Sequence, residues 1–136
     1  MDTNNNACTQ TRKSLRVFLV EDSELVRQRL EELVDSISGT CRVGFAVGAD
    51  EAIRSILATH PDAVVLDIRL AEGSGFDVLR AVHDAAPDIA VFMLSNFAST
   101  PYRRMAQRLG AAEFFDKTTE LDRVRDMLAE RARVLN

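Results

Sequence analysis

The chain has 136 residues, of which 46% are hydrophobic and 28% are charged, a composition typical of a single globular domain with one real core. Its formal net charge is −4, and this mildly acidic balance argues against nucleic acid as a direct partner. No segment approaches the roughly 18 consecutive apolar residues of a membrane span, and the polar N-terminus lacks the apolar region of a secretory signal. Cys8 and Cys41 have no metal-binding spacing, so we expect two free thiols in a cytoplasmic protein.

The N-terminal residues are polar, rich in Asn and Thr, and without periodicity. They predict a disordered tail over 1–13 and a single domain over 14–136. The domain begins with an apolar strand at 15–20. From Ser23 the apolar residues recur with helical period, and Gly39 is expected to stop this helix.

The middle of the chain repeats the same alternation. A second strand is predicted at 42–47, followed by a short helix from about Asp50 that the His-Pro pair at 60–61 closes. The third strand, 63–68, is apolar throughout except for one carboxylate near its end. The Gly-Ser-Gly sequence at 73–75 opens the next helix.

The last third of the chain adds two more strands and two more helices. A fourth strand is predicted at 89–95, and Ser-Thr-Pro at 99–101 supplies a helix cap followed by proline in the first turn. That helix ends before Gly110, a fifth strand follows at 112–116, and the last helix starts near Thr119. The apolar faces of the predicted helices comprise Val26, Leu30, Leu33, Val34 and Ile37; Ile53, Ile56 and Leu57; Phe76, Leu79, Val82 and Ala86; and Leu121, Val124, Leu128 and Leu135.

Strands that alternate with helices predict an α/β fold with a doubly wound, five-stranded parallel sheet covered on both faces. Right-handed crossovers place the helices in two layers. In such sheets the functional groups lie beyond the carboxyl ends of the strands, at the point where the strand order reverses. The residues at those ends are therefore the first candidates for a site.

Polar side chains stand at the ends of four predicted strands. Glu21 and Asp22 follow the first strand, Asp67 lies at the end of the third, Ser95 ends the fourth, and Lys117 follows the fifth. Each alone has a plain structural explanation, because a strand-end Asp often caps a helix, a Ser often starts a turn, and a Lys is usually solvated. Together they predict one site with three carboxylates, a hydroxyl and an ammonium group.

The residue types indicate phosphoryl chemistry. Three close carboxylates repel one another and favour a bound cation, and oxygen ligands select a hard ion such as Mg²⁺. A carboxylate can attack a phosphoryl group, and Asp67 is the candidate nucleophile because it ends the central strand. The Lys117 ammonium can neutralise the phosphoryl oxygens, and the Ser95 hydroxyl can donate a hydrogen bond to one of them.

Five segments in order carry a resemblance to a known family. They are VEDS at 20–23, VLDIRL at 65–70, the glycine at 75, MLSN at 93–96, and GAAEFFDK at 110–117. Over about 15–135 the chain resembles the receiver domain of response regulators in two-component signalling. The resemblance implies the flavodoxin-like strand order 2-1-3-4-5.

The resemblance also implies roles for the acidic site. Asp67 would be the phosphoacceptor, while Glu21 and Asp22 would form the acidic pocket that holds Mg²⁺. The backbone carbonyl of Arg69 would be a further metal ligand, and Lys117 would pair with the phosphoryl group.

A conformational switch is implied as well. Ser95 would move toward the new phosphoryl group, and Phe114 would be the aromatic residue whose rotamer changes with it. Phe114 has a second explanation that stays open, because Phe114 and Phe115 point to opposite faces of a buried strand and must also fill the core.

The sequence departs from the family pattern at three positions. The family usually has proline after its lysine, through a cis bond, whereas Thr118 stands here; a cis bond before a non-proline residue costs about 3–4 kcal/mol, so we predict either a trans bond or a strained loop. Ala71 replaces a frequent proline four residues after the acceptor, and Asn96 is larger than the usual residue after the switch hydroxyl. These changes bear on rates and on signal coupling.

The expected function is that of a stand-alone, single-domain receiver. A histidine kinase or histidine phosphotransfer protein would phosphorylate Asp67 in a Mg²⁺-dependent reaction. The protein would not be an enzyme, apart from catalysing its own phosphorylation and slow dephosphorylation. The signal would leave through the fourth helix, fifth strand and fifth helix to a protein target, from a monomer or weak dimer without nucleic acid or membrane contact.

Two alternatives belong to other classes. A Mg²⁺-dependent phosphohydrolase with an aspartate nucleophile would need a second acid two residues later, where Arg69 stands. A receiver-like interaction module that never takes phosphate usually lacks the acceptor, a pocket acid or the lysine, and this chain has all three.

Overall fold

The computed structural model describes residues 14–135, so the predicted tail at 1–13 lies outside the described residues. Within the described part, strands and helices alternate without exception. The elements are β1 (Leu15–Val20), α1 (Glu24–Asp35), β2 (Thr40–Ala46), α2 (Ala49–Thr59), β3 (Ala63–Asp67), α3 (Gly75–Ala85), β4 (Ala90–Ser95), α4 (Thr100–Arg108), β5 (Glu113–Asp116) and α5 (Leu121–Leu135).

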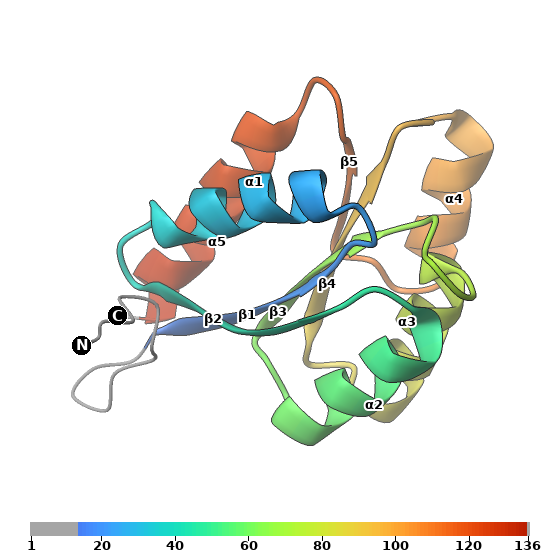
Figure 1. Ribbon diagram of the computed structural model, residues 1–136, viewed down its shortest axis with the longest axis horizontal. Helices are drawn as coiled ribbons and strands as arrows, with labels where there is room; N and C mark the ends of the chain where they lie inside the picture. The colour runs from blue at the N-terminus through green and yellow to red at the C-terminus, as the bar shows by residue number, and fades with distance from the viewer. Residues whose placement is uncertain (1–13, 136) are drawn as a thin grey trace.

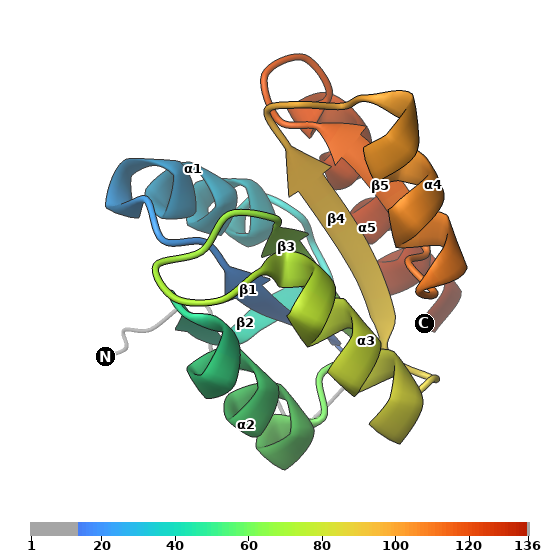
Figure 2. The same cartoon turned by 90° about the vertical axis from the view of Figure 1, so that its right-hand side faces the viewer.

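The five strands form one parallel sheet in the order β2-β1-β3-β4-β5, which confirms the predicted fold. Helices α1 and α5 cover one face of the sheet, and α2, α3 and α4 cover the other (Figures 1 and 2). Strand β3 is central and buried along its whole length, because helices cover both of its faces. The reversal of strand order therefore falls between β1 and β3.

Each face of the sheet has its own hydrophobic core. Phe18, Leu66 and Met93 contribute to the core under α2 and α3, while Leu19, Val65 and Phe92 contribute to the core under α1 and α5. Neighbouring residues of one strand thus enter opposite cores, as the alternation of side chains requires. The two cores hold the sheet firmly between its helix layers, so the ends of the strands are also held in fixed positions.

Two local predictions are wrong. Helix α1 ends at Asp35, before Gly39, because the Ser36 hydroxyl donates to the Leu33 carbonyl at 2.7 Å and the backbone there turns out of the helix. Gly39 instead adopts a left-handed conformation in the following turn, with φ of 87°. Leu57 is 38% exposed, because it faces away from the α2 stripe that buries Ile56.

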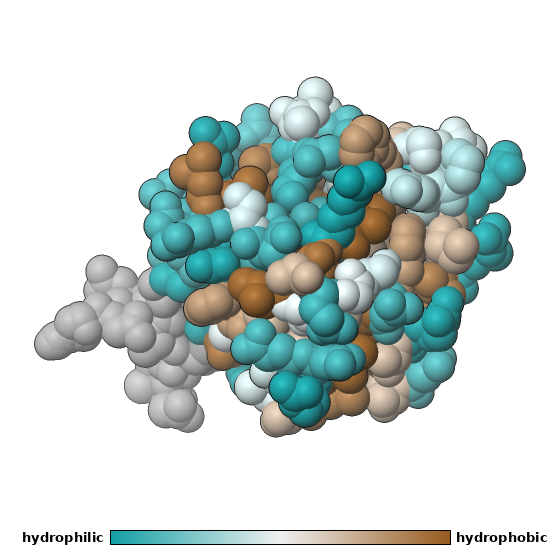
Figure 3. Space-filling model, turned by 45° about the vertical axis from the view of Figure 1, so that its right-hand side comes forward, coloured by the Kyte–Doolittle hydropathy of each residue, from teal (hydrophilic) through white to brown (hydrophobic). Residues whose placement is uncertain are grey.

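Cys41 is buried and disulfide-bonded, so the prediction of a free thiol at this position is wrong. Cys8 lies outside the described residues. Among residues 14–135, no helix is long and apolar enough to cross a membrane. On the side of the molecule that Figure 3 shows, apolar surface is divided into small areas separated by polar side chains.

Candidate functional site

The register of the sheet brings the predicted site residues to one edge. Val20 pairs with Leu66, Asp67 pairs with Leu94, and Ser95 pairs with Asp116. The residues at or just after these positions therefore emerge side by side, although they come from distant parts of the sequence. Glu21, Asp67 and Ser95 are all buried, whereas Asp22 is exposed.

Lys117 connects the two buried acids. Its Nζ donates to Oδ2 of Asp67 at 2.8 Å and lies 2.9 Å from Oε1 of Glu21. The side chains are almost fully enclosed, with 9% of Lys117 and 8% of Asp67 exposed. In this low-dielectric surrounding the ammonium group is the nearest positive charge to both carboxylates, and neither could be buried in ionised form without it.

Burial and charge pairing oppose each other in setting the pKa values of Glu21 and Lys117. Burial raises the pKa of Glu21, and the negative charge of Asp67 adds to the rise, while Lys117 and the Ser23 backbone N–H partly oppose it. For Lys117 burial alone would lower the pKa, but the close contacts of its Nζ with the carboxylates of Asp67 and Glu21 outweigh burial and raise the pKa overall. The lysine is therefore a fixed cation at the site.

The acidic residues have the donor set of a hard cation. Carboxylate oxygens of Glu21, Asp22 and Asp67 all lie within 4.8 Å of one another. Oε1 of Glu21 is buried and accepts no hydrogen bond of good geometry, even though the Lys117 ammonium is close. An under-coordinated buried oxygen beside two further carboxylates suits Mg²⁺, which takes one or two carboxylates and retains waters.

The other oxygen of Asp67 is held by the backbone. Oδ1 accepts from the Ile68 N–H at 2.8 Å, so hydrogen bonds fix both oxygens of the carboxylate. Arg69 lies next along the chain and makes an isolated antiparallel bridge with Ser74, which closes the loop after β3. The predicted role of the Arg69 carbonyl as a metal ligand stays a prediction.

A small hollow of about 30 Å³ lies between Asp67 and Ser95, and Asn96 and Phe97 are part of its lining. That volume has room for a water molecule. The Ser95 Oγ accepts from the Phe97 N–H at 2.9 Å, so the hydroxyl hydrogen is free to point elsewhere. Phe97 is 56% exposed, and the Arg69 guanidinium lies over its ring at 5.2 Å from the centroid.

Sequence reasoning did not assign Phe97 a place in the site. A single aromatic residue after a strand carries no periodic or spacing signal, and its proximity to Arg69 depends on how two loops fold. It forms part of the wall of the hollow beside Asp67.

Gly75 allows α3 to approach β3. A Cβ at this position would lie 2.1 Å from the Asp67 carbonyl oxygen and 2.9 Å from the Ile68 Cα. The Gly75 N–H donates to the Ile68 carbonyl at 2.7 Å, which ties the start of the helix to the end of β3. Only glycine permits this contact between the two backbones, and the contact packs the start of α3 against the backbone of Asp67.

The Lys117–Thr118 peptide bond is trans, as the sequence predicted, since residues 14–135 contain no cis bond. The loop is held by hydrogen bonds instead. Asp116 Oδ1 accepts from both the backbone N–H and the hydroxyl of Thr118, at 2.8 Å and 2.6 Å, and the Lys117 N–H donates to the Ser95 carbonyl at 2.9 Å.

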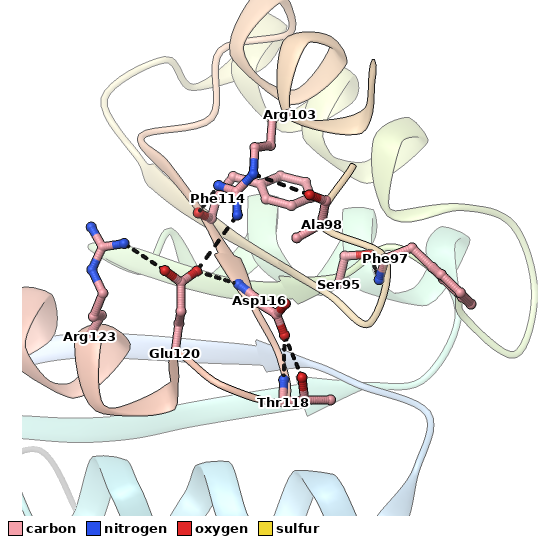
Figure 4. A network of polar contacts seen from close by, with 9 residues as sticks. All are labelled: Ser95, Phe97, Ala98, Arg103, Phe114, Asp116, Thr118, Glu120 and Arg123. Atoms are coloured by element: carbon pink, nitrogen blue, oxygen red, sulfur yellow. Dashed lines mark hydrogen bonds and ion pairs between the residues drawn. The ribbon is translucent and has the colours of Figure 1, made fainter. Parts of the chain in front are cut away.

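Phe114 is buried on the α4 side of β5, where Arg103 covers it (Figure 4). The Arg103 guanidinium lies 5.1 Å from the ring centroid, donates to the Phe114 carbonyl at 3.2 Å and contacts the Ala98 carbonyl at 3.4 Å. It also lies 3.8 Å from Glu120, whose carboxylate accepts from the Asp116 N–H at 2.7 Å. Arg103 thus connects α4, Phe114 and the loop that carries Lys117, a set of contacts that charge pattern alone does not indicate. The switch role of Phe114 stays a prediction.

Comparison with known proteins identifies the family. The family model for the response regulator receiver domain matches residues 17–129. The "Protein-glutamate methylesterase/protein-glutamine glutaminase 3" of Geobacter sulfurreducens is 31% identical over 108 residues, which cover 79% of this chain and 29% of that protein. The "DNA-binding transcriptional activator DevR/DosR" of Mycobacterium tuberculosis is 33% identical over 103 residues, which cover 76% of this chain and 48% of that protein. The chain thus spans less than half the length of these relatives.

Solved structures agree with the family match. The response regulator domain of Thermotoga maritima CheB has 27% identity and a TM-score of 0.77, with 90% of this chain and 96% of that chain covered. The signal receiver domain of NarL from Mycobacterium tuberculosis has a TM-score of 0.81 at 24% identity, with 89% and 98% covered, and at that identity it supports the fold alone.

Proposed function

Because the chain belongs to the response regulator receiver domain family of two-component signalling, we propose that it accepts a phosphoryl group on Asp67 and passes the signal to another protein. The observation that carries the proposal is the position of Lys117, whose Nζ joins Asp67 to Glu21 at 2.8 Å and 2.9 Å. A buried lysine beside a strand-end carboxylate and two further acids is the arrangement that phosphoryl transfer to a carboxylate needs.

The transfer itself requires little covalent chemistry from the protein. An oxygen of the Asp67 carboxylate attacks phosphorus and forms the acyl phosphate, while the bond from phosphorus to the donor breaks and the donor leaves with that electron pair. Lys117 is positioned to neutralise charge on the phosphoryl oxygens. The Ser95 hydroxyl lines the same hollow and is available to donate to one of them.

Glu21, Asp22 and Asp67 would hold Mg²⁺, which supplies charge neutralisation of the transferred group when it is bound. The protein's own contribution is to keep these oxygens within 4.8 Å of one another on strand ends that cannot separate. Burial that raises the pKa of Glu21 disfavours its free carboxylate, so a bound cation relieves the cost of ionising it.

The proposed donor is a histidine kinase or histidine phosphotransfer protein in the cytoplasm. Catalysis by the chain would extend to its own phosphorylation and slow dephosphorylation, so it would not act as an enzyme on other molecules. The activities named for the two relatives, those of a protein-glutamate methylesterase and a DNA-binding transcriptional activator, belong to proteins of which the match covers only 29% and 48%.

The output is proposed to leave through α4, β5 and α5. The phosphoryl group would place about −1.5 to −2 charges beside Ser95 in place of the single negative charge of Asp67, and movement of that hydroxyl would change the space next to Phe114. Arg103 covers Phe114 from α4, so a change in the ring position would reach the helix surface. A hollow of about 340 Å³ between α4 and β5, lined partly by Arg103 and Phe114, lies on this face.

Intact-mass spectrometry with a small acyl phosphate donor tests the acceptor. The parent and Asp67→Asn would be incubated with the donor and Mg²⁺, with and without chelator, and sampled at short times. A single phosphoryl adduct that requires Mg²⁺ and is absent from Asp67→Asn is the expected result. Folded parent protein that takes no phosphoryl group would favour an interaction module that works without phosphorylation.

A further inference from the structure

The loop that carries Lys117 lacks the proline that usually stiffens it, yet it delivers the ammonium group to two buried carboxylates. A lysine side chain has a flexible four-carbon stem, so the position of Nζ depends on how firmly its backbone is held. In this chain Thr118 retains a backbone N–H that proline would not have. What that N–H binds determines how the loop is held.

The N–H and the hydroxyl of Thr118 both donate to the same oxygen of Asp116, at 2.8 Å and 2.6 Å (Figure 4). Each of these bonds closes a ring that includes the backbone of Lys117, because Lys117 lies between the two residues in the chain. A turn closed by an aspartate side chain restricts the residue that it encloses. The Lys117 N–H is fixed from the other side by the Ser95 carbonyl at 2.9 Å.

The turn is also anchored to the rest of the fold. The Asp116 N–H donates to the Glu120 carboxylate at 2.7 Å, and the Glu120 N–H donates to the Asp116 carbonyl at 2.9 Å. Glu120 in turn pairs with Arg123 at 2.9 Å. Glu120 therefore holds the backbone of Asp116, and the Asp116 side chain closes the turn from a fixed position.

We propose that Asp116 is a positioning residue, whose carboxylate closes a turn on Thr118 and thereby directs the Lys117 ammonium toward Asp67 and Glu21. This inference rests on the proposed phosphoryl transfer for its kinetic consequence, but the placement of Lys117 can be measured without it. The Thr118 hydroxyl, and after it the Thr118 N–H, donates to Asp116 and lowers the pKa of that carboxyl. The ionised carboxylate, which accepts both bonds, is therefore the form present at neutral pH.

The test compares Asp116→Ala with Asp116→Asn, which keeps an accepting oxygen, and with Asp122→Ala as a matched control in the first turn of α5. The rate of adduct formation would be measured against donor concentration with Mg²⁺ present. Asp116→Ala should lower the maximal rate by about 10-fold to 100-fold, the range expected when a catalytic group is displaced by ~1 Å. The donor concentration that gives half the maximal rate should change little. Asp116→Asn and Asp122→Ala should stay within about twofold of the parent.

Two further measurements separate positioning from general damage. In a Lys117→Ala background, Asp116→Ala should cause no additional loss of rate, because its effect passes through the lysine. The NMR titration of the Lys117 Cε resonance, with no donor present, should show a lower pKa in Asp116→Ala than in the parent, since the ion pairs that raise it are weakened. Thr118→Val, which loses the hydroxyl bond and keeps the N–H, should fall between parent and Asp116→Ala.

Equal rates and equal Lys117 titration in Asp116→Ala and the parent would overturn the inference, as would an equal loss in Asp116→Asn. A parent that never takes phosphate, with a Lys117 pKa that still falls in Asp116→Ala, would refute the proposed function and leave the positioning role standing.

Discussion

Gly75→Ala should destabilise the protein and impair the acceptor, although alanine is the better helix former. The added Cβ would lie 2.1 Å from the Asp67 carbonyl oxygen, whereas real Cβ atoms essentially never come within 3.0 Å of another heavy atom. The clash is with backbone on a central strand, so no flexible side chain can move to relieve it. Helix α3 and the end of β3 must separate by roughly 1 Å, because an interior this densely packed has no spare room.

The expected magnitude follows from two opposing terms. Replacing glycine by alanine within a helix gains up to about 1 kcal/mol, while inserting a methyl group into a packed site costs about 1–3 kcal/mol. The free energy of unfolding should therefore fall by about 1–2 kcal/mol. A displacement of Asp67 by ~1 Å should also slow its phosphorylation by about 10-fold to 100-fold.

Gly48→Ala is the matched control at the same edge of the sheet. Its nearest neighbour would be the end of the Glu72 side chain at 3.1 Å, which can move, and its φ of −126° is open to any residue. Urea unfolding and adduct formation would be measured for both variants. A Gly75→Ala protein as stable as the parent or more stable, as helix propensity alone predicts, would refute the steric argument.

Three further changes test the charges around the site. Lys117→Met removes the cation between two buried carboxylates and should lower the free energy of unfolding by about 3–5 kcal/mol in chelator, measured by urea unfolding; addition of Mg²⁺ should recover part of it. Because burial raises the pKa of Glu21 above its ordinary value of 4.5, the folded state binds its proton more tightly, and the contribution of Glu21 to stability without divalent cations should be full below that pH and decline as pH rises through the folded pKa. Glu21→Gln should abolish this decline in a pH series of unfolding curves, and persistence of the decline would assign it to another group. Arg103→Ala should cost about 1 kcal/mol through its contacts with Phe114, whereas Arg104→Ala, an exposed neighbour, should leave the unfolding midpoint unchanged.

The site could be predicted from sequence because it depends on a rule of topology. Parallel strands share one carboxyl edge, so Glu21, Asp67, Ser95 and Lys117 had to converge once the strands were identified. A continuous run of apolar residues bounded by turn signals, as in β3, indicates a buried strand. The register of the sheet then fixes the convergence to within a residue or two.

What sequence could not supply were contacts made by loops and caps. The early end of α1 depends on a hydrogen bond from Ser36, which competes locally with the helix. The aspartate turn around Lys117 depends on two residues, Asp116 and Thr118, whose individual signals are those of ordinary surface positions. The stacking of Arg69 on Phe97 arises from two loops that have no periodic pattern to reveal it.

Under the proposed function, one lysine serves both the resting and the phosphorylated state, and the charges at the site give the reason. Three carboxylates and one ammonium group leave a net charge of about −2, which a divalent cation balances. On the proposed reaction, the phosphoryl group replaces the single negative charge of Asp67 by about two and spreads it over new oxygens. The Lys117 ammonium then has a stronger partner than the Asp67 oxygen it binds at 2.8 Å, so its bond must be redistributed. The loop that carries it is hydrogen-bonded to Glu120, which lies 3.8 Å from Arg103 on α4. A change in the hydrogen-bond partner of Lys117 Nζ would therefore reach, through Glu120 and Arg103, the surface through which the signal is proposed to leave.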